Sequence, residues 1–354
     1  DVGEDGTVDG GPMYYISKGL KERGFKTFGK IVAIIFAIFC IGGSFGGGNA
    51  AQSNQATVVL KELMGLESTG AGFWIGVIMA IVVGIIIIGG IKRIASVTEK
   101  VVPFMALLYL LACLYILGAN FSLIDDAFSL IFREAFNPTA IGVGGVIGVL
   151  LVGFKRAAFS NEAGAGSASI AHSAVKTKYS ASEGLVALLE PFIDTVVICT
   201  MTALVIIIFN FGGDASGATI FQYGGDGAGA VLIDGVSYEG AGITSKAFAE
   251  YIPYSNVFLT VAVVLFAVST MISWSYYGLQ SWKFLFGRGK AADMAYKLLF
   301  LLFVIIGASA SMNSIWAFSD AMIFAMVFPN MVGLYFLFPV VKKQLNRYIE
   351  AIKS

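Results

Sequence analysis

The chain has 354 residues, of which 57% are hydrophobic and only 13% are charged, and its formal net charge is zero. Soluble domains usually carry about 25% charged residues, so a water-soluble globule of this length would lack the charge to coat its surface. The neutral balance gives no sign of a nucleic-acid-binding surface, and no Walker A, nucleophile-elbow or dinucleotide-binding motif indicates an enzyme. The composition predicts an all-α polytopic membrane protein.

Stretches without Asp, Glu, Lys or Arg locate the membrane spans, because about 20 apolar residues cross a bilayer. They predict eight transmembrane helices in a single domain over residues 31–343. The predicted helices cover residues 31–60, 70–91, 101–120, 139–172, 183–211, 254–283, 292–310 and 312–343. The fourth of these, 139–172, is expected to be broken.

Basic residues set the orientation of such helices, because cytoplasmic loops carry an excess of Lys and Arg. With residues 1–30 placed in the cytoplasm as a loop, 18 of the 23 basic residues fall in cytoplasmic segments. We therefore expect both ends of the chain on the cytoplasmic side of the cell membrane, with residues 344–354 as a tail. Residues 212–253 become a long external loop, which is either a functional lid or a loosely packed cap.

Two further features concern the cysteines and the start of the chain. Cys40, Cys113 and Cys199 lie in apolar runs without metal or redox spacing, so we expect them to pack inside helices. The chain begins at Asp1 without a signal peptide, and its opening resembles an inter-helix loop. We expect it to lack N-terminal residues.

The apolar pattern breaks first at residues 42–55, inside the first span. Glycines there allow close helix approach, and Asn49, Gln52 and Asn54 place amides at membrane depth. Two interpretations are open: the amides join helices, or they line a cavity.

The second break follows residue 153. Phe159, Ser160, Asn161 and Glu162 precede seven small residues that include Gly164. This composition favours an unwound point followed by a half-helix, whose N–H groups would face a carboxylate and whose freed carbonyls would suit a cation. An ionisable group at this depth is a functional candidate, although Glu162 pairing with Lys155 or Arg156 merely to hold the loop is the alternative.

The third break is a polar stripe in the sixth span. Ser269 and Ser273 are four residues apart, as are Thr270 and Trp274. Hydroxyl oxygens are hard ligands of the type that sodium accepts. Alternatively, the hydroxyls bond back to carbonyls of their own helix.

Together these segments resemble the alanine or glycine:cation symporter family. The segments that carry the resemblance are residues 10–16 (GGPMYYI), 48–54 (GNAAQSN), 159–168 (FSNEAGAGSA), 190–195 (EPFIDT), 266–270 (FAVST) and 329–333 (PNMVG). The resemblance implies a LeuT-type inverted-repeat fold of five plus five helices, in which sodium or protons drive uptake of alanine or glycine. It implies no cofactor beyond the coupling ion, sodium, and no partner beyond the small amino acid, the ion and the lipid bilayer.

Members of the family begin with three further helices, one of them broken and bearing a G-T-G-N-type sequence that this chain lacks. The eight spans would then match helices three to ten of the ten-helix core. The resemblance assigns sodium to the hydroxyls of Ser269 and Thr270. It assigns the substrate to Phe159, Ser160, Asn161, Glu162, Gly164, Trp274, Gln52, Asn49 and Asn54.

Within these assignments, the backbone of residues 160–164 is expected to meet the amino acid. Trp274 is expected to close the floor of the pocket. A proton-coupled carrier that uses Glu162 or Asp194 is the main alternative, and an ion channel is the alternative of another class.

Overall fold

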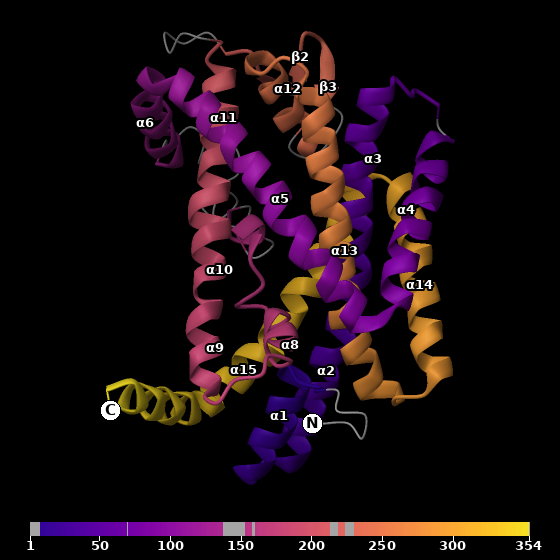
Figure 1. The fold of residues 1–354 in the computed structure, drawn as a ribbon, viewed down its shortest axis with the longest axis vertical. Coiled ribbons are helices and arrows are strands. Elements are labelled where there is room, and N and C mark those ends of the chain that lie inside the picture. Colours follow the sequence, from indigo (N-terminus) through magenta and orange to yellow (C-terminus); the bar gives the residue numbers. More distant parts are fainter. Residues whose placement is uncertain are drawn as a thin grey trace.

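A computed structural model describes residues 8–68, 70–136, 153–157, 160–212, 219–223 and 230–353 (Figure 1). Within them, seven helical stretches are long and apolar enough to cross a membrane: Lys26–Met64, Ala71–Ile88, Arg93–Ala119, Ser180–Asn210, Ser255–Phe286, Lys290–Ser309 and Met312–Lys353. Each overlaps one of the eight expected ranges. The remaining range, 139–172, falls partly outside the described residues, so the eighth helix stays a prediction.

The outer surface of these helices is apolar. Trp74 and Ile85 are 66% and 60% exposed, and many other large hydrophobic side chains also face outward. A surface of this kind is unfavourable in water but matches the hydrocarbon of a bilayer. The chain is therefore an integral membrane protein.

Residues 1–30, expected to be a loop, contain the helix α1 (Pro12–Glu22). Proline suits the first helical position, because its missing N–H would be unpaired there in any case. Met13, Ile16 and Leu20 are fully buried, and their spacing places them on one face of the helix. This apolar face explains why α1 packs against the body of the protein. The low overall hydropathy of residues 1–30 did not indicate such a helix.

The first span joins three helical segments: α2 (Lys26–Phe45), the π-helical turn η1 (Gly46–Ala50) and α3 (Ala51–Met64). The π turn coincides with the first break in the apolar pattern. A side chain at Gly48 would collide with the indole ring of Trp274. Glycine at this position therefore lets the first span approach the sixth.

Two helices, α4 (Ala71–Ile88) and α14 (Lys290–Ser309), run side by side at one edge of the bundle (Figure 1). A Cβ atom at Gly76 would lie 3.0 Å from the Cα of Ile305. Small residues allow this close approach, as is usual for helices that pack in a membrane.

Two further helical stretches meet at the opposite edge of the bundle, which the first of them reaches by crossing the molecule from α4 (Figure 1). The first consists of α5 (Gly90–Ala119), η2 (Phe121–Leu123) and α6 (Ile124–Ala135). The second consists of α9 (Ser180–Ala187), α10 (Leu189–Pro191), the π-helical η3 (Phe192–Cys199) and α11 (Thr200–Asn210). Cys113 of α5 and Ile208 of α11 belong to one buried cluster, which holds the two stretches together.

The expected external loop contains regular structure. Strands β1 (Gln222–Tyr223), β2 (Val231–Ile233) and β3 (Val236–Tyr238) form an antiparallel sheet in the order β1-β2-β3, followed by α12 (Ala241–Tyr251). Asp234 and Gly235 have φ angles of 53° and 79°, and this pair joins β2 to β3 as a two-residue turn in which both residues are left-handed. The description of residues 212–253 as a loop was therefore too simple.

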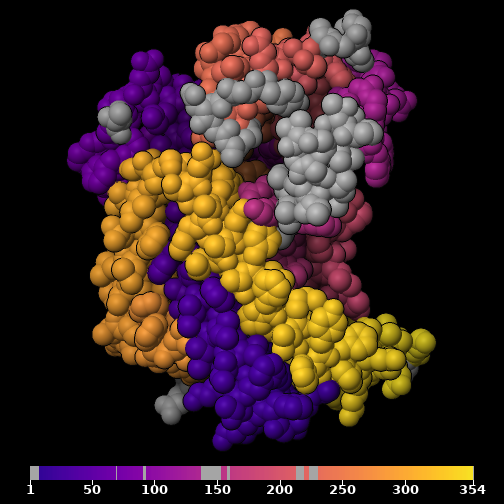
Figure 2. Space-filling view, turned by 180° about the vertical axis from the view of Figure 1, so that it is seen from behind, coloured from indigo at the N-terminus to yellow at the C-terminus, as the bar shows by residue number. Residues whose placement is uncertain are grey.

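The two longest helices of the described residues complete the bundle. Helix α13 (Ser255–Phe286) packs against α2 and α3, and α15 (Met312–Lys353) contains Pro329 and Pro339. Figure 2 shows α15 crossing the back of the molecule beside the N-terminal residues and leaving the body at its C-terminal end. The expected tail, 344–354, is thus helical as far as Lys353.

Candidate functional site

The second predicted break is an irregular segment between Ser160 and the short helix α8 (Ala168–His172). The side-chain oxygen of Asn161 accepts a hydrogen bond from the backbone N–H of Ala163 at 3.0 Å, which is a local turn typical of Asn. Gly166 has a φ of +99°, and its backbone N–H donates to the carbonyl of Glu162 at 2.9 Å. The chain here is unwound, as the run of small residues predicted.

Glu162 connects this segment to α13. The indole N–H of Trp274 donates a hydrogen bond to Glu162 Oε1 at 2.6 Å. The same ring is buried against Gly48 of η1. Thus residues from all three predicted breaks meet at one indole ring.

The alternative partners proposed for Glu162 are engaged elsewhere. Arg156 Nη2 lies 2.7 Å from Asp320 Oδ1 of α15, and Lys155 Nζ lies 3.8 Å from Asp320 Oδ2. The idea that Glu162 merely pairs with these basic residues is therefore wrong. Its hydrogen bond goes to the deeply buried Trp274 instead.

Ser160 fastens the start of the unwound segment to η3. Its hydroxyl donates to Asp194 Oδ2 at 2.6 Å and lies 3.0 Å from Thr195 Oγ1. The π-helical turn of η3 carries both of these residues, and such turns are frequent at functional sites. Three oxygen-bearing side chains consequently gather beside the break.

A pocket of about 480 Å³ lies between the unwound segment, α9, α10 and α13. It is lined by Ser160, Asn161, Glu162, Ala168, Ala171, His172, Val175, Glu183, Val186, Glu190 and Tyr277. Three of these residues carry carboxyl groups. The lining therefore suits a cation or the ammonium group of an amino acid better than an anion.

His172 occupies a special place in this pocket. Its Nδ1 lies 2.7 Å from Glu183 Oε1, and its Nε2 lies 3.0 Å from Glu190 Oε1. The ring joins α8 to both α9 and α10.

Asn330 of α15 supports the unwound backbone from the other side. Its amide donates to the carbonyl of Gly164 at 3.0 Å, and its side-chain oxygen accepts a hydrogen bond from Tyr15. A Cβ atom at Gly166 would lie only 2.7 Å from Asn330 Cγ. Both the glycine and the amide are needed to hold this backbone shape.

The three amides of the first break point mainly toward backbone carbonyls. Asn49 donates to the carbonyl of Phe300 at 2.6 Å, and Asn54 donates to those of Gly307 at 3.0 Å and Ala310 at 2.9 Å. Gln52 donates within its own span, to the carbonyl of Gly47 at 3.0 Å. In this conformation Asn49 joins η1 to α14, and Asn54 joins α3 to α14. Asn54 also lines a different pocket of about 290 Å³.

The two predicted sodium ligands lie on α13 just before Trp274. The hydroxyl of Ser269 donates to the carbonyl of Phe266 at 2.9 Å, and Thr270 is half-buried. Neither residue lines the 480 Å³ pocket. Phe159, the remaining predicted site residue, lies outside the described part of the chain.

Comparison with known proteins identifies the family. The profile of the sodium:alanine symporter family matches residues 1–354. This chain belongs to that family. It is 37% identical over its whole length to a sodium/alanine symporter of Methanococcus maripaludis, of which it covers 72%.

Two further relatives agree with this assignment. The chain is 32% identical over 79% of its length to a sodium/proton-dependent alanine carrier protein of a Bacillus species, covering 62% of that protein. It is 28% identical over 99% of its length to an amino-acid carrier protein of Bacillus subtilis, covering 68% of that protein. This member of the sodium:alanine symporter family is a cation-coupled amino acid transporter and not an enzyme.

Several site residues of this symporter were not assigned from the sequence. They are His172, Glu183, Glu190, Tyr277 and Asn330. For Asn330 a signal existed, because an amide directly after Pro329 interrupts an apolar helix. His172 was the only histidine of the chain, but nothing near it in sequence announced two carboxylate partners.

Proposed function

We propose that this chain is a sodium-coupled symporter that moves alanine or glycine into the cell by alternating access. The observation that carries the proposal is the 2.6 Å hydrogen bond between Trp274 and Glu162. It brings an unwound backbone, a carboxyl group and a bulky buried ring to one end of an acidic pocket. Unwound backbone of this kind offers carbonyls to an ammonium group and N–H groups to a carboxylate.

We propose that the packing around Trp274 limits the substrate to a small side chain. The indole ring is held between Gly48 and Glu162, and it is 3% exposed. The ring is not among the residues that line the 480 Å³ pocket, so this limit would act where the substrate meets Glu162. We propose that Ser160, Asn161, Glu162 and Gly164 surround the amino acid, with Phe159 beside them.

For the coupling ion we propose sodium, held by the hydroxyls of Ser269 and Thr270. A proton is the alternative, because one relative is named as sodium/proton-dependent. Glu162 and Asp194, which accept hydrogen bonds from Trp274 and Ser160 respectively, are the carboxyl groups that would carry the proton.

We also propose eight crossings, with both chain ends in the cytoplasm. Helix α1 and the last part of α15 lie toward the same end of the molecule (Figure 1). Helix α6 lies toward the opposite end, and α8 lies on the side of α1 (Figure 1). An eighth crossing within residues 139–172 would be consistent with this arrangement. Strands β2 and β3 and helix α12 would then face the outside.

Uptake of labelled alanine by proteoliposomes that contain the complete carrier tests the proposal. An inward sodium gradient is expected to drive accumulation above the external concentration, and unlabelled glycine is expected to compete. Accumulation that requires a proton gradient alone would replace sodium by protons as the coupling ion. Equilibration without accumulation under either gradient would overturn symport and favour a channel.

A further inference from the structure

The last part of α15 lies across the foot of the bundle. The helix has 42 residues, so it is about 63 Å long, roughly twice the ~30 Å thickness of the bilayer hydrocarbon. Pro339 lies inside it, and proline kinks helices. After this point the helix passes the start of α9 and projects sideways from the bundle (Figure 1). We therefore expect residues 340–353 to lie at the membrane surface, since the bilayer hydrocarbon accounts for only about half of the length of α15.

This segment is amphipathic. Val341, Leu345, Tyr348 and Ile352 recur at intervals of three and four residues, which places them on one face of the helix. The other side carries exposed Lys342, Lys343 and Arg347. An apolar face opposite Lys and Arg side chains is typical of helices that lie in the plane of a membrane surface.

Contacts with the start of α9 fix the segment in place. The ring of Tyr348 packs 5.7 Å from the ring of Tyr179, and the guanidinium of Arg347 lies 5.9 Å from the same ring. Val341 and Ile352 nevertheless remain 56% and 64% exposed. The apolar face is therefore only partly covered by the protein.

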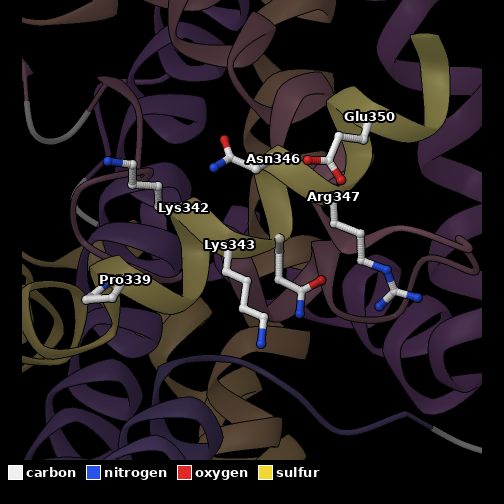
Figure 3. Close-up of a pocket in the computed structure, with 7 residues that line it drawn as sticks. Pro339, Lys342, Lys343, Asn346, Arg347 and Glu350 are labelled. Carbon is white, nitrogen blue, oxygen red and sulfur yellow. The ribbon is translucent and has the colours of Figure 1, made fainter. Parts of the chain in front are cut away.

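A hollow of about 590 Å³ follows the basic side of this segment. It is lined by Pro339, Lys342, Lys343, Gln344, Asn346, Arg347 and Glu350 (Figure 3). The side chains of Lys343 and Arg347, one helical turn apart, extend from the same side of the helix (Figure 3). Three basic residues against one acidic residue give the hollow a positive charge, and two amides add hydrogen-bond donors.

We propose that this hollow binds the headgroup of an anionic phospholipid. Lys343 and Arg347 would hold the phosphate, since both are strong donors to phosphate oxygens. The exposed apolar side chains next to them would enter the boundary of the acyl chains. A free phosphate ion would leave that apolar face in water, so the combination of charge and exposed apolar surface favours a lipid. The proposal holds whichever ion drives transport.

Hydrogen–deuterium exchange of the full chain in nanodiscs tests this proposal. We expect residues 340–353 to exchange more slowly in discs of phosphatidylcholine with phosphatidylglycerol than in discs of phosphatidylcholine alone. Native mass spectrometry of the detergent-solubilised protein would measure the affinity for phosphatidylglycerol directly. The triple variant Lys342→Gln/Lys343→Gln/Arg347→Gln is expected to lower that affinity between about tenfold and 100-fold.

A matched variant separates this site from a general effect of charge. Lys21→Gln/Arg23→Gln/Lys26→Gln removes three exposed basic residues near the same end of the molecule, and it is expected to keep the slow exchange of residues 340–353. Equal losses in both triple variants would overturn a specific site. Slow exchange produced by inorganic phosphate in phosphatidylcholine discs, or unchanged exchange in both lipids, would also overturn the proposal.

Discussion

At the residue scale, Trp274 has two separable properties, its bulk and its hydrogen bond to Glu162. Trp274→Phe keeps most of the bulk but removes the N–H donor. The loss of a hydrogen bond to a carboxylate costs about 1.5–3 kcal/mol, so the half-saturating alanine concentration is expected to rise roughly 10- to 150-fold. Transport kinetics in proteoliposomes measure this change.

Trp282→Phe, on the same helix, is the matched control. The indole nitrogen of Trp282 is buried without a hydrogen-bond partner among the described residues, so its removal is expected to leave the alanine dependence nearly unchanged. Equal effects of the two substitutions would mean that lost packing, and not the bond to Glu162, explains the result.

Thr270 tests the proposed sodium site. Losing one of a few oxygen ligands is expected to cost about 1–3 kcal/mol, which raises the half-saturating sodium concentration of Thr270→Ala roughly 5- to 150-fold. Thr260→Ala removes a buried hydroxyl elsewhere on α13 and serves as the comparison. If sodium dependence moves in Asp194→Asn but not in Thr270→Ala, the oxygen cluster around Ser160 and Asp194 is the better candidate.

Gly166 and Gly164 give a paired test of the unwound backbone. Gly166 has a φ of +99°, and a Cβ atom at this position would collide with the side chain of Asn330. At Gly164 a Cβ atom would have no neighbour within 4 Å. A left-handed conformation costs a non-glycine residue about 1–2 kcal/mol. Gly166→Ala is therefore expected to lower the free energy of unfolding of the purified protein by at least about 1–2 kcal/mol, which a thermal melt detects as a lower melting temperature.

The companion substitution Gly164→Ala is expected to have little effect on stability. Because the space at Gly164 is open, any loss of alanine binding in Gly164→Val would come from filling that space. A stability loss in Gly164→Ala as large as that in Gly166→Ala would contradict the proposed difference between the two glycines.

At the scale of elements, the sequence predicted the long helices that a bilayer requires. The long charge-free stretches correspond to long helices, because in lipid every backbone polar group needs a partner and a helix supplies these partners within one segment. The short strands β2 and β3 were missed, since three residues are too few to reveal an alternating pattern. The pair Asp234–Gly235 between apolar residues was nevertheless a usable hairpin signal.

The candidate site was predictable only in part. The small residues after Glu162 indicated an unwound segment, because such breaks have a local composition. The partner of Glu162 lies 112 residues away along the chain, and no local pattern specifies a contact at that distance. For the same reason the pairing of Arg156 with Asp320 was not foreseen.

His172 allows a test of how α8 is joined to α9 and α10. His172→Ala removes the contacts with both Glu183 and Glu190. Hydrogen bonds to charged groups contribute about 1.5–3 kcal/mol each. The variant is therefore expected to melt at a lower temperature than the wild type.

Glu183→Gln serves as the comparison, because it keeps the contact between His172 and Glu190. It is expected to lower the melting temperature less than His172→Ala does. An unchanged melting temperature in His172→Ala would mean that the ring does not hold the three helices together.

At the scale of the whole molecule, the distribution of basic residues predicts the direction in which the transporter sits. The predicted cytoplasmic segments include the N-terminal helix and the end of α15, and both of these lie at one end of the molecule (Figure 1). The β2–β3 turn lies at the other end. Because cytoplasmic segments retain Lys and Arg, this turn is expected to face the outside.

Cysteine labelling in intact cells with a membrane-impermeant maleimide checks this direction. Val236→Cys, next to the β2–β3 turn and 54% exposed in the native side chain, is expected to react from outside. Asn346→Cys, exposed on the last part of α15, is expected to react only after the cells are opened. The parent protein controls for Cys199, since Cys40 and Cys113 are buried. The reverse labelling pattern would invert the orientation and place the basic end of α15 on the outer leaflet.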